Sequence, residues 1–169
     1  YKYDKDGLIA KSGKVNELIL NQAIDNFLKQ DEDKFESLDL KDFNISFVRG
    51  LSLEDGAATL THLTARLIGD GLIHFMLKNY APRLDTLSKA ICLVCGGGRK
   101  NKYLIEILRD NLNIKKLILI DDHGIKGDFI ESQAFGNLAI RSYLGLPISF
   151  PNTTGCKKPS TGGIIVKNY

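Results

Sequence analysis

The spacing of apolar residues predicts helices in the first half of the chain. Within residues 12–30, apolar side chains recur every three or four positions, which is the pattern of an amphipathic helix. The charged stretch 31–42 then predicts an exposed connection. A longer helical pattern follows over residues 52–76 and begins at Ser52, whose spacing to Asp55 is that of a capping box. Two glycines inside it, at 69 and 71, predict a kink or close packing.

From residue 90 the pattern alternates between strand and helix. Residues 90–95 and 115–121 are short apolar runs, and residues 102–112 between them have helical spacing. This order predicts a βαβ unit whose parallel strands are buried on both faces. Another helix is predicted over residues 128–143, and the apolar run 162–168 could add a strand. The fold class is therefore α/β.

Length and composition are those of one globular domain. The chain has 169 residues, of which 43% are hydrophobic and 25% charged, so disordered, collagenous and membrane classes are excluded. A net charge of +3, scattered along the chain, does not predict nucleic-acid binding. The first residues, YKYDKDG, do not have the pattern of a signal peptide, and no apolar run approaches the roughly 20 residues that a bilayer span requires. We expect a cytoplasmic protein with no membrane partner.

The three cysteines predict neither a disulfide framework nor a metal site. Cys92 and Cys95 form a C-x-x-C within an expected strand, where positions three apart point to opposite faces, so they are interpreted as core residues. Cys156 is isolated, and the odd number favours reduced thiols. The histidines are interpreted as a loop residue at 123 and as helix-surface residues at 62 and 74.

Gly96, Gly97 and Gly98 lie between a predicted strand and a predicted helix. Ligands in open α/β sheets bind beyond the carboxyl ends of strands, and glycines let the backbone approach a phosphate closely. A tight turn alone would need one glycine, so the triplet favours a nucleotide site. Asn101 stands where the dinucleotide fingerprint G-x-G-x-x-G needs its last glycine. Asp121, in contrast, could take the place of the ribose-binding acid of a Rossmann unit. A dinucleotide-binding oxidoreductase therefore remains an alternative, with Asp121 otherwise a turn residue.

Glu131 allows two interpretations. With Asp128 it forms D-x-x-E at the start of a predicted helix, which is typical of a capping box. Glu131 also shares a helix face with Ala134, Phe135 and Leu138, so its carboxylate heads an apolar stripe and could bind a polar ligand.

Several segments together resemble the C-terminal half of the anhydro-N-acetylmuramic acid kinase family. They are YDKDGLIAKSGKVN (3–16), ATLTHLTA (58–65), LVCGGGRKN (93–101), DDHGIKGDFIESQAFGNLAIR (121–141), TGC (154–156) and GGIIV (162–166). The resemblance implies a ribonuclease H-like lobe of the actin and sugar-kinase type, with a mixed sheet flanked by helices. Residues 1–169 would then be the C-terminal lobe of a two-lobed kinase. Because Tyr1 is not Met, we expect the N-terminal lobe to be encoded upstream.

The resemblance also implies a reaction. The family uses ATP, Mg²⁺ and water to open the anhydro ring of 1,6-anhydro-N-acetylmuramic acid and to phosphorylate O6 during cell-wall recycling. It implies that Gly96, Gly97, Gly98 and Asn101 bind ATP, and that Glu131 contacts the sugar while Asp128 caps the helix and holds the loop. The general base, an Asp, is expected upstream, so no catalytic residue is assigned to this chain. The implied partners are the N-terminal lobe and, in a homodimer, a second copy of the enzyme.

Two segments depart from the family pattern. Residues 37–40 lack the usual Gly and Arg before Phe43, and residues 160–162 replace apolar residues in the tail. A third hypothesis is a lobe without catalytic activity, which would serve only as a weak nucleotide binder or an assembly surface.

Overall fold

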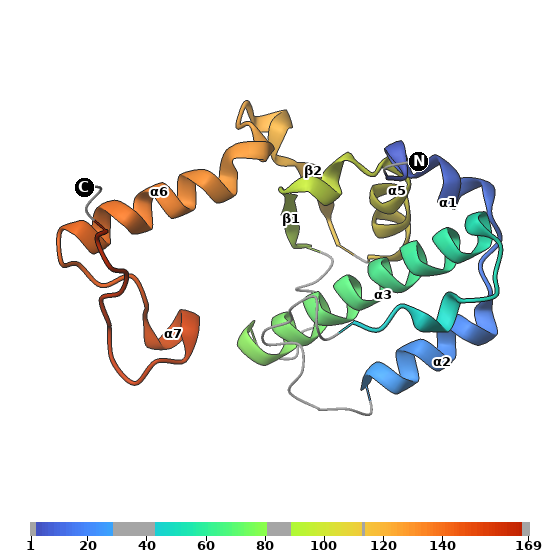
Figure 1. Cartoon of the computed structure of the whole chain (residues 1–169), viewed down its shortest axis with the longest axis horizontal. Helices are drawn as coiled ribbons and strands as arrows, with labels where there is room; N and C mark the ends of the chain where they lie inside the picture. Colours follow the sequence, from blue (N-terminus) through green and yellow to red (C-terminus); the bar gives the residue numbers. More distant parts are fainter. Residues whose placement is uncertain (1–2, 29–42, 81–88, 113, 167–169) are drawn as a thin grey trace.

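Helices form most of the structure, and a small parallel sheet lies beside them (Figure 1). The computed structural model describes residues 3–28, 43–80, 89–112 and 114–166. The helices are α1 (Leu8–Ser12), α2 (Glu17–Leu28), α3 (Leu53–Tyr80), α5 (Lys102–Asn111), α6 (Ile130–Tyr143) and α7 (Pro151–Thr154), and the strands are β1 (Ile91–Val94) and β2 (Lys116–Leu119). Short 3-10 turns include η3 (Ser46–Val48), η4 (Gly97–Lys100), η5 (Ile120–His123) and η6 (Gly127–Phe129).

The helix predicted from residue 12 begins instead at Glu17, after a short separate helix α1. The chain breaks between them because it must pass close to α3: a Cβ on Gly13 would lie 2.1 Å from the carbonyl oxygen of Glu54. Asn16 then caps α2, its side-chain oxygen accepting a hydrogen bond from the Ile19 backbone at 3.1 Å. The predicted end of this helix, at residue 30, and the predicted connection 31–42 lie outside the described residues.

The long central helix α3 confirms its prediction. Ser52 caps it, the hydroxyl accepting a hydrogen bond from the Asp55 N–H at 3.1 Å. The helix continues without a break through both internal glycines. Gly69 lies where α5 packs, and a Cβ there would be 3.4 Å from Leu112. Of the two predicted alternatives for this glycine, close packing is observed.

The βαβ unit is also confirmed, with β1 and β2 parallel and Ile91 paired with Lys116. The expected burial on both faces is wrong for β1, because Ile91 and Leu93 are 56% and 52% exposed. Helix α5 packs on one face of the pair, and the other face leaves Ile91 and Leu93 exposed. The described strands form a parallel pair, so the expected mixed sheet is not seen in these residues.

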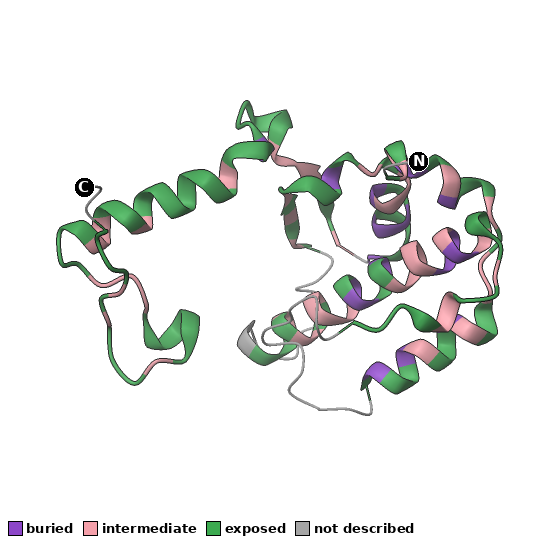
Figure 2. Cartoon of the chain, in the orientation of Figure 1, coloured by how far each residue is buried: buried purple, intermediate pink, exposed green. Residues whose placement is uncertain are grey.

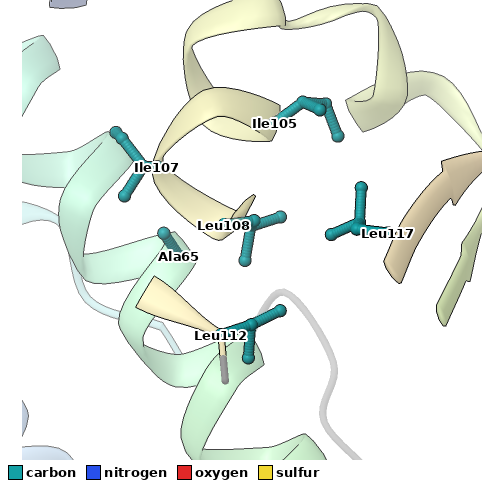
Figure 3. Close-up of a cluster of buried hydrophobic side chains, with 6 residues drawn as sticks. All are labelled: Ala65, Ile105, Ile107, Leu108, Leu112 and Leu117. Atoms are coloured by element: carbon teal, nitrogen blue, oxygen red, sulfur yellow. The ribbon is translucent and has the colours of Figure 1, made fainter. Parts of the chain in front are cut away.

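The main core lies between α3, α5 and β2 (Figure 3). Its buried members are Ala65, Ile105, Ile107, Leu108, Leu112 and Leu117. Burying a Leu or Ile side chain contributes about 1.5–3 kcal/mol, so this cluster holds α5 between the long helix and the sheet. A second contact joins α1 to α3, and each of these helices has a completely buried alanine, Ala10 and Ala58.

Helix α6 extends away from α1, α2, α3 and α5 and has no buried residue (Figures 1 and 2). It ends as Gly145 takes a left-handed conformation, and the N–H of Leu146 donates to the Arg141 carbonyl at 2.8 Å. The strand predicted over residues 162–168 is wrong for the described residues 162–166, which form no strand. No helix of the described segments is long and apolar enough to cross a membrane.

Candidate functional site

Gly96, Gly97 and Gly98 form a turn, called here the glycine turn, that begins two residues after the end of β1. All three glycines are exposed to solvent. Gly96 has φ 78° and ψ 179°, a conformation that in practice only glycine adopts. Gly97 and Gly98 have no such conformation, and a Cβ on Gly97 would meet no heavy atom within 4 Å. A Cβ on Gly98 would only touch Leu104, at 4.0 Å. The fold therefore requires glycine at one of the three positions, and the other two keep the backbone open to a ligand.

Asn101, predicted to bind ATP, has a structural role at the start of α5. Its side-chain oxygen accepts a hydrogen bond from the Leu104 N–H at 3.0 Å and so caps the helix. Gly7 packs against the same oxygen, since a Cβ there would lie only 2.2 Å away. Contact between Asn101 and a nucleotide stays a prediction.

Arg99, which the sequence analysis did not single out, is the best-connected polar residue of this turn. It is only 7% exposed although the glycines before it are open. Its Nε and Nη2 donate to the two carboxylate oxygens of Asp121 at 2.6 and 3.1 Å. Its Nη1 donates to the Gly96 carbonyl and to Asp128, both at 2.8 Å. One guanidinium thus joins the glycine turn to the loop that follows β2.

The sequence contained one signal for this cluster. The carboxyl ends of parallel neighbouring strands lie at the same edge of the sheet, so residues that follow β1 and β2 meet there. Arg99 follows β1 and Asp121 follows β2, and their charges are opposite.

Electrostatics in the cluster favour the charged forms. Hydrogen bonds from Arg99 lower the pKa of Asp121 to about 2. Hydrogen bonds from Arg99 and then Lys100 lower the pKa of Asp128 to about 2. The same contacts with Asp121 and Asp128 raise the pKa of Arg99. Both carboxylates are therefore ionised at neutral pH and accept hydrogen bonds from Arg99.

Gly127 is buried against this cluster. A Cβ at this position would lie 2.4 Å from Nε of Arg99 and 2.9 Å from a carboxylate oxygen of Asp121. The Gly127 N–H also donates to Asp121 at 3.3 Å. The loop thus needs glycine here for close approach to the ion pair.

The two interpretations of Glu131 now separate. The residue before α6 is Phe129, and no side chain caps the helix, so the capping box with Asp128 is wrong. Asp128 accepts hydrogen bonds from Arg99 and Lys100 instead, which confirms only its predicted role in holding the loop. Glu131 is exposed in the first turn of α6, next to that loop. Its contact with a ligand stays a prediction.

The cysteines and histidines lie outside the Arg99 cluster, and they differ in how far they are buried. Cys92 is half-buried, and burial raises its pKa, but Cys95 is exposed, so the core interpretation is wrong for Cys95. His62 is not a free surface residue, since its ring nitrogen lies 3.1 Å from the Tyr103 hydroxyl. His74 is half-buried, whereas His123 is exposed in η5 as expected for a loop histidine.

In the described part of the chain, one pocket lies beside α5 and another beside α2. A pocket of about 350 Å³ lies beside Arg99 and is lined by α5 side chains of both charges, including Lys102, Glu106 and Arg109. A larger, mostly apolar pocket of about 970 Å³ lies between α2, η3 and α3. Its lining includes no residue of the glycine turn or of the Arg99 cluster. Over the described residues, no group of three or more His, Cys, Asp or Glu side chains could hold a metal ion.

Comparison with known proteins identifies the family. The family model described as anhydro-N-acetylmuramic acid kinase matches residues 1–168. Similar proteins of that name come from Pelagibacter ubique, 51% identical over 99% of this chain and 44% of the relative, and from Zymomonas mobilis, 41% identical over 96% and 41%. A third, from Caulobacter vibrioides, is 40% identical over 98% of this chain and 41% of the relative. The chain thus spans about two fifths of the length of these curated relatives, and it belongs to the anhydro-N-acetylmuramic acid kinase family.

Proposed function

We propose that this chain is the nucleotide-binding C-terminal lobe of a kinase that phosphorylates 1,6-anhydro-N-acetylmuramic acid. The glycine turn carries the proposal. At two of its three positions a Cβ would fit without a clash, these glycines are exposed, and they follow the carboxyl end of a parallel strand. Family membership supports the proposed class of substrate, because the relatives are named for this activity.

The proposed reaction consumes ATP, water and the anhydro sugar. The water oxygen bonds to the anomeric carbon, and the bond from that carbon to O6 breaks. O6 takes the γ-phosphoryl group of ATP, which leaves N-acetylmuramic acid 6-phosphate and ADP. The proton of the attacking water goes to a general base, an Asp proposed to lie in the N-terminal lobe.

Within this chain, the proposed roles are binding and orientation. The backbone at Gly97 and Gly98 approaches the adenosine side of ATP, Asn101 lies next to it, and Glu131 accepts hydrogen bonds from the sugar. Mg²⁺, when bound, offsets charge on the transferring phosphoryl group. The described residues of this chain offer no cluster to hold the ion, so the proposal assigns it to the nucleotide phosphates and the other lobe.

A partner surface is part of the proposal. Large apolar side chains are exposed along α6 and on the open face of β1, among them Phe135, Ile140 and Leu93. Clusters of this kind are typical of surfaces that another protein segment covers. The N-terminal lobe and a second copy of the enzyme are the proposed occupants.

The contacts of Asp121 argue against the alternative of a dinucleotide-binding oxidoreductase. Asp121, which would have to bind a ribose, has both carboxylate oxygens engaged by Arg99. A ribose hydroxyl would compete with a bidentate ion pair for those oxygens.

Calorimetry on the complete gene product tests the proposal. We expect ATP with Mg²⁺ to bind, 1,6-anhydro-N-acetylmuramic acid to bind, and NAD to give no heat. Tight binding of NAD would contradict the assignment. Weak ATP binding without any response to the sugar would favour a lobe that has no catalytic role.

A further inference from the structure

The Arg99 cluster connects two segments that the proposed function gives to different substrates. The glycine turn ends at Arg99, and the loop from Asp121 to Asp128 leads directly into α6, where Glu131 is the second residue. Arg99 holds the Gly96 carbonyl on one side and the carboxylates of Asp121 and Asp128 on the other. The position of the turn and the position of the loop are therefore linked through one side chain.

The side chain that links the glycine turn to the loop, Arg99, is closely packed. Arg99 is 7% exposed, and Gly127 approaches it so closely that a methyl group would not fit between them. A displacement of the turn would have to break the contact to Gly96 or carry Asp121 and Asp128 along. Such a packed polar cluster transmits a shift between discrete arrangements better than a loose surface pair does.

Arginine suits this position for a geometric reason. Its planar guanidinium donates to the Asp121 carboxylate in a fork while its remaining donors reach the Gly96 carbonyl and Asp128. A lysine would keep the positive charge, but its compact ammonium cannot span all three partners.

We propose that Arg99 is a positioning residue that makes the nucleotide and the amino sugar bind cooperatively. The proposal rests on the proposed function, because it takes the glycine turn as the nucleotide site and Glu131 as a sugar contact. Binding of either substrate fixes its own segment and, through Arg99, orders the other. The cooperativity is reciprocal: the sugar raises the affinity for ATP by the same factor by which ATP raises the affinity for the sugar.

The test measures that factor in the complete gene product by calorimetry. The affinity for a non-hydrolysable ATP analogue with Mg²⁺ is measured without the sugar and then with the sugar at saturation. For the wild type we expect an increase on the order of 10-fold, within the usual range of coupling between sites. For Arg99→Lys we expect an increase below about 2-fold, with circular dichroism unchanged.

Two further variants make the result interpretable. Arg66→Lys alters another Arg–Asp pair, with Asp70 in α3, which is exposed and outside the cluster, and it should keep the wild-type factor. Asp128→Asn removes the negative charge that faces Arg99 and Lys100 but leaves the fork to Asp121, so the factor should be intermediate. If Arg99→Lys does not fold, Asp128→Asn decides the question, since Asp128 is about half exposed.

The possible outcomes distinguish a failure of the proposed role of Arg99 from a failure of the proposed kinase function. Wild-type protein that binds neither ligand contradicts the proposed function and, with it, the role of Arg99. Wild-type protein that binds both ligands independently contradicts only the role of Arg99. A folded Arg99→Lys protein that keeps the wild-type factor also overturns that role, because the arginine would then only stabilise the fold.

Discussion

Valine substitutions at Gly96 and Gly97 distinguish two effects in the turn after β1. One is strain in the backbone, and the other is obstruction of a ligand. Gly97→Val places a side chain in open space, since a Cβ there meets no heavy atom within 4 Å and the backbone needs no positive φ. Its effect on the free energy of unfolding should stay within about 0.5 kcal/mol, as for an ordinary surface substitution. Gly96→Val, in contrast, forces a branched residue into φ 78° and ψ 179° and should cost about 1–3 kcal/mol.

The same valine at Gly97 should obstruct ATP. Inserting a side chain into a closely packed contact costs about 1–3 kcal/mol. A loss of that size lowers the affinity for ATP by about 5–150-fold. Urea denaturation and ATP calorimetry on the complete gene product, with both variants and the wild type, measure the two effects. Wild-type affinity for ATP in a folded Gly97→Val protein would refute the reasoning and reduce the triplet to a turn.

Three other consequences can be measured by denaturation. Gly127→Ala should destabilise the protein by about 1–3 kcal/mol, because its Cβ would lie 2.4 Å from Nε of Arg99; an unchanged urea midpoint would contradict that packing. Leu108→Ala should cost about 2–5 kcal/mol, since Leu108 is 4% exposed in the core, and a loss below 1 kcal/mol would show a core that is looser than described. The pKa values of Asp121 and Asp128, lowered to about 2 from an ordinary value of 3.8, give stability that is complete above pH 4 and lost as the pH falls from about 4 to 2. Replacing both by Asn should flatten the pH dependence of unfolding in that window, and a slope equal to that of the wild type would contradict the ion pairs.

Local signals in the sequence predicted most elements of the fold. The periodicity of residues 52–76 and the cap at Ser52 predicted α3, and the order of apolar runs predicted the parallel pairing of β1 and β2. These features depend on neighbours a few residues apart, which the sequence displays directly. The glycine turn after β1 was predicted for the same reason.

Features that depend on distant segments were missed. The break at Gly13 exists because the chain passes against the Glu54 carbonyl, 41 residues away. The start of α6 looked like a capping box, but Asp128 is drawn to Arg99 instead. The apolar run of β1 also suggested burial on both faces, whereas burial depends on what covers a face, and that information is not local.

Arg99 shows the same limit at the candidate site. As one arginine among 23 basic residues, it stood out only after the strand order had brought Asp121 beside it. Glycine and acidic residues carried the sequence argument because their patterns are recognisable in isolation. The residue that connects them becomes recognisable once the parallel pairing of β1 and β2 is taken into account.

The most direct test of the central claim is the product formed by the complete gene product in water enriched in ¹⁸O. With ATP, Mg²⁺ and 1,6-anhydro-N-acetylmuramic acid, mass spectrometry should show equal amounts of ADP and N-acetylmuramic acid 6-phosphate. The sugar product should carry one ¹⁸O at the anomeric carbon and none in its phosphate, because water attacks that carbon and the phosphoryl group goes to O6. ADP formed without sugar phosphate, or label in the phosphate, would contradict the proposed kinase reaction.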